Sequence, residues 1–296
     1  MPIFTILTDW NIMKKLFYAV LMAVLMLVSV DSNAQTAKSL FWKADSLQVT
    51  EILSEVSDRS AEVGHQGPAV ENSHMALCLC FDDSGAIDLY SKSGRGMELI
   101  THLWHPSAEA REMAAAGCDA YVVGETLGFG GYALWDGEKE VRLVATGGRK
   151  VSVGDTKKGT YAEVISYGVP YQGDFVDISL RIDVSNKSRE AVVTAMELSG
   201  KKIQFLTGMN YHHGQSVVMG EDYISVWGDH PGDELSIPVG TGIRFSKKEF
   251  PVIEKADDMV RIISKSSSLV RTTLIGASVM EAELNSAKRF EAYLAQ

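Results

Sequence analysis

The sequence predicts an all-β protein, a large antiparallel β-sandwich with a few short helices. From about residue 70 onward, short runs of β-branched and aromatic residues recur, and Gly, Asn and Asp separate them. In the run 175–184, FVDISLRIDV, Val176 and Ile178 lie on one face and Asp177 and Ser179 on the other, as in a strand buried on one side. About ten such runs without an evident boundary favour one large sandwich.

The predicted strands are short and are bounded by turn residues. They are MALCLCF (75–81), AIDLYSK (86–92), EVRLVAT (140–146), FVDISLRIDV (175–184), AVVTAMEL (191–198), KIQFLTGMNY (202–211), YISVWG (223–228), GIRFS (242–246), MVRIIS (259–264) and LVRTTLIGASV (269–279). The polar residues 185–190 predict a hairpin loop between two of them.

Helical patterns are confined to three places. The apolar spacing of residues 39–57 allows an amphipathic helix or an irregular lead-in segment. Residues 107–116, SAEAREMAAA, predict a helix with Ser107 as its N-cap and Gly117 as its stop. Apolar residues at helical spacing predict a closing helix over residues 281–294.

The first 34 residues have the pattern of a secretory signal peptide. Met13 is followed by two lysines, an apolar run over residues 16–30 and small residues that end at Ala34. The apolar run is shorter than the ~20 residues that span a bilayer. We therefore expect a start at Met13, cleavage after Ala34, and a periplasmic or secreted protein without a membrane span. Residues 35–64 would then lead into a β-domain over residues 65–296.

Composition and charge exclude one class of partner. The chain has 28 Lys and Arg against 38 Asp and Glu, and its net charge of −10 repels phosphate backbones, so nucleic-acid binding is not expected. Cys78 and Cys80 are two residues apart on one face of a predicted strand, a poor geometry for a disulfide bond. We expect these two and Cys118 to be small buried hydrophobic residues.

The glycine-rich stretch 122–137, VVGETLGFGGYALWDG, does not predict a nucleotide site. No P-loop lysine follows it and no βαβ unit surrounds it. Glycines between strands more often mark a bulge, a tight turn or a close backbone approach, and we expect one of these here.

The seven histidines show no metal-ligand spacing such as HExxH. We therefore expect no catalytic metal and no cofactor, although a structural Ca²⁺ stays open. The segment NYHHGQ (210–215) continues a predicted strand, so His212 would share a face with Asn210, and His213 with Tyr211. The two imidazoles would then not act as one pair. Either one of them is functional or both are structural.

Three segments together resemble a known family. They are GPAVENSHMALCLCFDDSGAIDLYSK (67–92), AGCDAYVVGETLGFGGYALWDG (116–137) and TGMNYHHG (207–214) with the following ISVWGD (224–229). They are similar to an exported family of unknown function from bacterial polysaccharide-utilisation loci. The pattern falls on Glu71-Asn72, Lys92, Leu127 to Gly131, and His212, over about residues 65–294. Cys118 and His213 depart from it.

The resemblance implies a supersandwich like that of galactose mutarotases. It also implies a lyase, similar to an ulvan-type oligosaccharide dehydratase, that eliminates water from a terminal uronate. Such a reaction needs a proton-transfer group, a cation at the carboxylate, and orienting donors.

Candidate residues for these roles come from the resemblance and from polar and aromatic loop segments. The catalytic candidates are His212, Lys92, His105 and Tyr211, with Lys92 or Arg244 as the charge neutraliser. The substrate-binding candidates are His65, Glu71, Asn72, Asp119, Asn210, Trp227 and Arg244.

The expected partner is an oligosaccharide, and the oligomeric state is left open. A non-catalytic glycan-binding protein is the main alternative, because a fold does not prove an activity. A sugar epimerase or mutarotase is the other, and it would need a histidine and a carboxylate that converge on one sugar ring.

Overall fold

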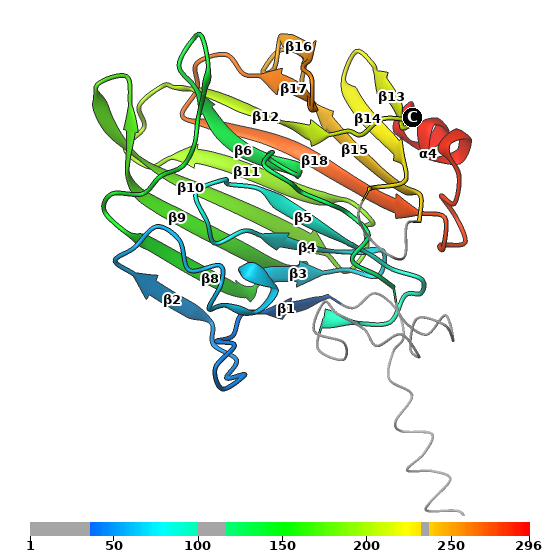
Figure 1. The fold of residues 1–296 in the computed structure, drawn as a ribbon, viewed down its shortest axis with the longest axis horizontal. Helices are drawn as coiled ribbons and strands as arrows, with labels where there is room; N and C mark the ends of the chain where they lie inside the picture. The colour runs from blue at the N-terminus through cyan, green and yellow to red at the C-terminus, as the bar shows by residue number, and fades with distance from the viewer. Residues whose placement is uncertain (1–35, 100–116, 232–236) are drawn as a thin grey trace, which may run out of the picture. The chain divides into compact units, whose positions relative to one another are not determined.

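Antiparallel strand pairing builds almost all of the ordered structure. The computed structural model describes residues 36–99, 117–231 and 237–296. Within these ranges the strands form three sheets of nine, five and four strands, and every pairing between named strands is antiparallel. The predicted all-β antiparallel sandwich is therefore confirmed (Figure 1).

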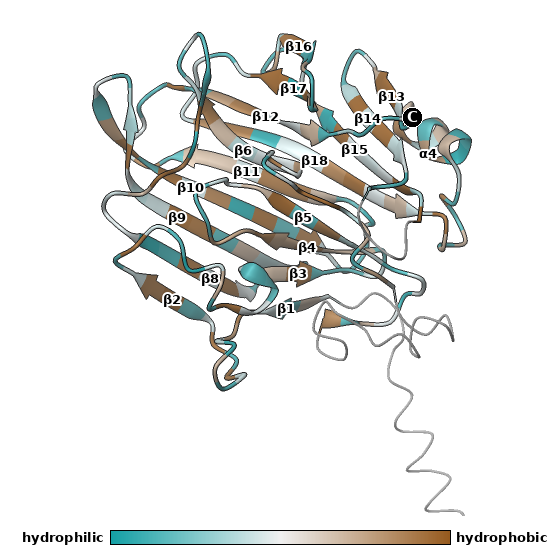
Figure 2. Cartoon of the chain, viewed as in Figure 1, coloured by the Kyte–Doolittle hydropathy of each residue, from teal (hydrophilic) through white to brown (hydrophobic). Residues whose placement is uncertain are grey.

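The nine-stranded sheet is one layer of the sandwich. Its strands, in spatial order, are β13 (Ser216–Met219), β14 (Tyr223–Gly228), β15 (Val239–Phe245), β18 (Leu269–Ser278), β11 (Ala191–Glu197), β10 (Asp174–Ser185), β9 (Gly159–Tyr171), β8 (Arg149–Asp155) and β2 (Glu51–Ser54). Hydrophobic and hydrophilic residues alternate along β10, as the sequence predicted (Figure 2).

Two smaller sheets form the other layer. The four-stranded sheet has the order β1 (Ala37–Ser39), β3 (Ala69–Glu71), β4 (Met75–Leu79) and β5 (Ile87–Ser91). The five-stranded sheet has the order β16 (Val252–Lys255), β17 (Met259–Ile263), β12 (Gln204–Asn210), β6 (Phe129–Trp135) and β7 (Glu140–Val141). An isolated parallel bridge between Ile87 and Gly128 joins the two sheets.

The core lies between the two layers. Gly276 of β18 faces Leu89 of β5, and an added Cβ would lie 3.0 Å from the Leu89 side chain. At Gly130 of β6, an added Cβ would lie still closer to its neighbour, 2.3 Å from the Leu274 side chain of β18. A Cβ would clash at Gly130 and would crowd the Leu89 side chain at Gly276, so glycine at both positions lets the layers approach. One contiguous cluster of buried residues spans both layers.

Several local predictions need correction. Of the two alternatives for residues 39–57, the irregular lead-in segment is confirmed and the helix is not; the segment also contributes the short strand β2. The predicted strand 140–146 is only the two-residue β7. The closing helix is α4 (Ala287–Leu294), shorter than predicted, and it packs Phe290 and Leu294 onto β14 and β15. The predicted helix over 107–116 lies outside the described residues.

Two other local predictions, for the cysteines and for the glycine-rich stretch, are confirmed. The cysteines Cys78, Cys80 and Cys118 are buried, as expected for small hydrophobic residues. The glycine-rich stretch carries a bulge: the pairing of β6 with β12 shifts register between Thr207 and Met209, opposite glycines that include Gly130 with a φ of +75°. Within the described ranges, no helix has the length and apolar character to cross a membrane.

Candidate functional site

A cavity of about 660 Å³ lies beside the edge of the four-stranded sheet. Asp88 of β5, the turn after β4, the segment 119–125 before β6, Arg142 after β7 and Pro231 after β14 all contribute to its lining. Its volume falls within the range of about 300–1,000 Å³ that is typical of small-ligand sites. A second cavity, of about 980 Å³, lies against β1 and β8, but none of the predicted site residues lines it.

The segment that forms one wall of the cavity is held by Asn210. The Tyr121 hydroxyl donates to Asn210 Oδ1, and Asn210 Nδ2 donates to the carbonyl oxygens of Val122 at 2.6 Å and Val123 at 3.3 Å. Asn210 is the last residue of β12 and is 2% exposed. A buried amide satisfied on both sides fixes the wall relative to the sheet.

Two imidazole rings, those of His230 and His212, pack in sequence against Tyr121. The His230 ring lies 4.4 Å from the Tyr121 ring and 4.8 Å from the His212 ring, measured between centroids. His230 Nδ1 accepts a hydrogen bond from the Val122 N–H at 3.2 Å. His212 is partly exposed, but its Nε2 is buried and has no hydrogen-bond partner among the described residues. We call Tyr121, Asn210, His212 and His230 the histidine–tyrosine cluster.

Burial sets the protonation of this cluster. It lowers the pKa of His230 to about 3, helped by the nearby His212, while a backbone hydrogen bond at Val122 acts in the opposite direction. Burial also lowers the pKa of His212 below its usual value. The pKa of Tyr121 is raised well above 10 by burial and by the charge of Asp88. At neutral pH the cluster therefore contains two neutral imidazoles and a protonated phenol.

The predicted alternation of faces through NYHHGQ is wrong. Strand β12 ends at Asn210, and residues 213–214 form a turn in which Gly214 has a φ of +92°. The turn is closed by a hydrogen bond from the His212 N–H to Gln215 Oε1 at 2.7 Å. His212 is directed to His230, while His213 is exposed. The two histidines therefore still differ in environment, but through a turn and not through a strand.

Lys92, Glu71 and Asn72 form a separate buried group. The Lys92 ammonium donates to Glu71 Oε1, to the Asn72 carbonyl at 2.9 Å and to the Gly96 carbonyl. These acceptors use all three N–H groups of the lysine. Glu71 also accepts the backbone N–H of Glu98 at 2.7 Å and of Leu99 at 2.9 Å. The group holds the 93–99 segment, and its lysine has no donor left for a substrate.

Arg244 and Trp227 belong to the attachment of α4. Arg244 donates to the carbonyl oxygens of Tyr293 and, at 3.3 Å, Leu294, and it pairs with Glu190 at 2.6 Å. A cation at the last carbonyls of a helix stabilises its C-terminus. The Trp227 ring packs 5.7 Å from that of Phe290. The structure does not bring either residue to the cavity.

The remaining candidates do not lie together at one site. Asp119 lines the cavity. The Tyr211 hydroxyl donates to the Ala256 carbonyl at 2.6 Å, and Lys255 lies over its ring. His65 is buried, with Nε2 3.0 Å from Ser39 Oγ. His105 lies outside the described residues.

Sequence reasoning missed Tyr121, His230 and Arg142. Tyr121 and His230 sit singly in loops, where no spacing marks them. Arg142 fell inside the predicted strand 140–146 and was not singled out. Only the fold brings the three loops to one place.

No cluster for a metal ion is present in the described part of the chain, where no three His, Cys, Asp or Glu side chains converge in a way that could hold one.

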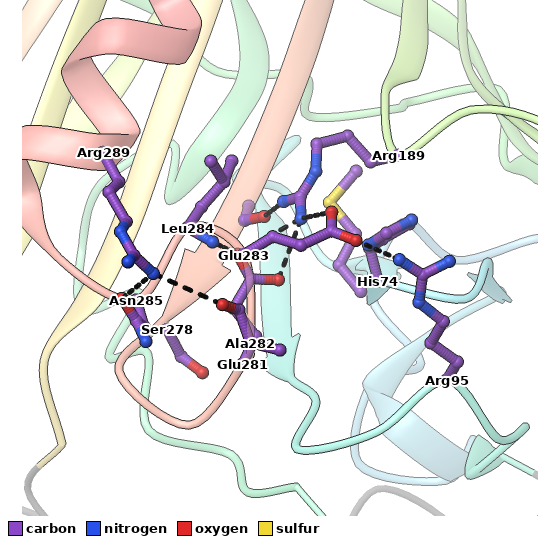
Figure 3. A network of polar contacts seen from close by, with 12 residues as sticks. His74, Arg95, Arg189, Ser278, Glu281, Ala282, Glu283, Leu284, Asn285 and Arg289 are labelled. Carbon is purple, nitrogen blue, oxygen red and sulfur yellow. Dashed lines mark hydrogen bonds and ion pairs between the residues drawn. The ribbon is translucent and has the colours of Figure 1, made fainter.

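A second polar network, shown in Figure 3, connects the β18–α4 segment to the four-stranded sheet. Arg189 pairs with Glu281 at 3.0 Å and donates to the Gly276 carbonyl at 3.1 Å. Arg95 pairs with Glu283, and both lie close to His74. Cations and carboxylates pair with one another in this network, so it fits a structural link better than a ligand site.

Comparison with known families gives one match. A family described as a domain of unknown function, DUF4861, covers residues 27–296. The chain belongs to the DUF4861 family. No curated protein matches it significantly. The family match agrees with the expectation of a family of unknown function, and the DUF4861 region contains both the cavity and the histidine–tyrosine cluster.

The lowered pKa of His230 predicts acid-sensitive folding. The folded state resists protonation down to about pH 3, whereas an unfolded histidine binds a proton below about pH 6.5. The contribution of the neutral His230 to the free energy of unfolding is therefore fully present above about pH 6.5, and it is lost as the pH decreases below that value. We expect the free energy of unfolding, measured with urea, to drop by about 2 to 4 kcal/mol between pH 7 and pH 4.

The variant His230→Asn should have a lower free energy of unfolding than wild type at pH 7, but it should lose less of that free energy when the pH falls to 4. Part of the pH dependence of stability should persist in this variant, because burial and nearby arginines lower the pKa of His74 to about 4. His213→Asn, which changes an exposed side chain, should keep the wild-type dependence. An unchanged pH dependence in His230→Asn would contradict the assignment.

Proposed function

We propose that this DUF4861 chain is an exported carbohydrate-active lyase, an oligosaccharide dehydratase that eliminates water across C4–C5 of a terminal uronate. The observation that carries the proposal is the place of His212: it is partly exposed, burial lowers its pKa, and it packs through His230 against Tyr121, which lines a sugar-sized cavity. The sequence resemblance supplies the substrate class, oligosaccharides that end in a uronate.

The reaction needs a base that is neutral at working pH. In the elimination, the base takes the C5 proton, the C5–H electron pair forms the C4–C5 double bond, and the C4–O bond breaks. The departing hydroxyl leaves as water after it accepts a proton. His212 fits proton transfer, because its lowered pKa keeps the imidazole free to accept a proton near neutral pH.

Tyr121, Asn210 and His230 fit positioning roles. His230 is 1% exposed and packs between Tyr121 and His212, so its ring fixes the orientation of His212. Asn210 in turn anchors Tyr121 and the segment behind it. A proton-transfer group held by packed neighbours loses less entropy when the substrate binds.

The test is the absorbance of the product. We expect the purified mature protein, incubated with uronate-ended oligosaccharides, to raise the absorbance near 235 nm, because only elimination forms the conjugated C4–C5 double bond. Mass spectrometry should show products lighter by one water. Binding without new absorbance would point to the glycan-binding alternative, and a change of sugar configuration without mass loss to the epimerase or mutarotase alternative.

A further inference from the structure

The cavity has an unequal distribution of charge. Its described lining contains six carboxylates and one guanidinium. The carboxylates belong to Asp58, Asp82, Asp83, Asp88, Asp119 and Glu125, and the guanidinium to Arg142. Ionised carboxylates only accept hydrogen bonds, so this wall suits a ligand rich in hydroxyl donors and opposes a ligand with several anionic groups.

Among the described residues that line this cavity, Arg142 is the one cation. Its Nη2 donates to the Glu125 carbonyl at 2.6 Å, while its ion-pair distances to Glu125 and Glu140 are 3.9 Å and 3.8 Å. The side chain is 41% exposed. One of its five N–H groups is thus used at hydrogen-bond distance, and the backbone bond holds the fork in place.

Neighbouring cations are already engaged. Arg149 has a side chain that is 1% exposed; it donates to the carbonyls of Asp82 and Leu143 and pairs with Asp83 at 3.5 Å. Lys92 and Arg244 are held in the groups described above. A planar guanidinium with open donors is the group that recognises a carboxylate through two parallel hydrogen bonds.

We propose that Arg142 recognises the carboxylate of the terminal uronate, and that the surrounding carboxylates restrict the ligand to a single anionic sugar. This inference rests on the proposed function and narrows it. The uronate sits at Arg142, and the sugars that follow it in the cavity are uncharged and are recognised through their hydroxyl groups. A chain with a sulfate on the sugar next to the uronate is a poor ligand.

The test is calorimetric binding of three trisaccharides at low salt. One carries a single terminal uronate, the second the matching neutral hexose, and the third the uronate with a sulfate on the next sugar. Wild-type protein should bind the first about 10 to 100 times more tightly than the second, as expected for a charge-assisted pair. It should bind the third more weakly than the first.

Three variants isolate the two parts of the inference. Arg142→Gln should bind the uronate and neutral ligands equally, and Arg142→Lys should be intermediate, because it keeps the charge but not the fork. Glu125→Gln, at a side chain 96% exposed, should improve binding of the sulfated ligand. Arg271→Gln changes an exposed arginine on β18 outside the cavity lining and should behave as wild type.

The outcomes separate this inference from the proposed function. If wild-type protein binds the uronate ligand and Arg142→Gln binds it equally well, the assignment of Arg142 is overturned and the proposed function stands. Tighter binding of the sulfated ligand than of the uronate ligand would overturn the restriction by charge. If wild-type protein binds none of the three ligands, the proposed function fails and the inference with it.

Discussion

Replacing Lys92 with methionine should lower the free energy of unfolding by about 3 to 5 kcal/mol, the typical cost of breaking a buried ion pair. The Glu71 side chain is 0% exposed and that of Lys92 is 1% exposed. The change leaves a buried carboxylate without its counter-charge and leaves two backbone carbonyls without a donor. Urea unfolding at pH 7, followed by tryptophan fluorescence, measures the loss.

A double variant tests the cause. Glu71→Gln combined with Lys92→Met should be more stable than Lys92→Met alone, because a neutral amide needs no counter-charge and still accepts the backbone N–H groups of Glu98 or Leu99. Lys139→Met, at an exposed turn position, should change stability by no more than about 0.5 kcal/mol. A Lys92→Met protein of wild-type stability that has lost turnover would restore the catalytic role that the resemblance implied.

The fold was predictable wherever one face of a strand is buried and the other exposed. The run 175–184 matches β10 within one residue at each end, because its burial alternates along most of the strand. The long strand β9 was missed, although it alternates in the same way. Its positive-φ Gly168 and its Pro170 look like turn residues in a sequence, but they lie next to the bulge where β9 pairs with β10. Turn composition therefore misleads at bulges.

The candidate site was predictable only in part. Asn210 and His212 belong to the histidine–tyrosine cluster, and Asp119 lines the cavity. These three could be predicted because they lie at the end of one strand and in one loop. Lys92 and Arg244 were chosen as free cations, yet their partners Glu71 and Tyr293 are 21 and 49 residues away. A sequence without the fold cannot show that a charge is already satisfied. For the same reason the sequence did not single out Arg142, whose proposed role depends on the residues that surround it in the fold.

His212→Asn should lower the turnover number about 10²- to 10⁴-fold, the usual contribution of a general acid or base. Asparagine keeps the approximate size of the side chain beside His230 but cannot accept and release a proton near neutral pH. The Michaelis constant should change little, because the carboxylate contact is assigned to another residue. Rates of absorbance increase near 235 nm, measured over a range of substrate concentrations, separate the two parameters.

His213→Asn is the matched comparison, since it makes the same substitution one residue further along an exposed turn. It should keep wild-type turnover, because the His213 side chain is exposed whereas the His212 ring lies 4.8 Å from the His230 ring. The lowered pKa of His212 also predicts that wild-type turnover stays constant as the pH falls from 8 to 6.5, and that it declines only below that value. Equal losses in the two variants would mean that the turn rearranges on binding, and unchanged turnover in His212→Asn would assign the proton transfer to another group.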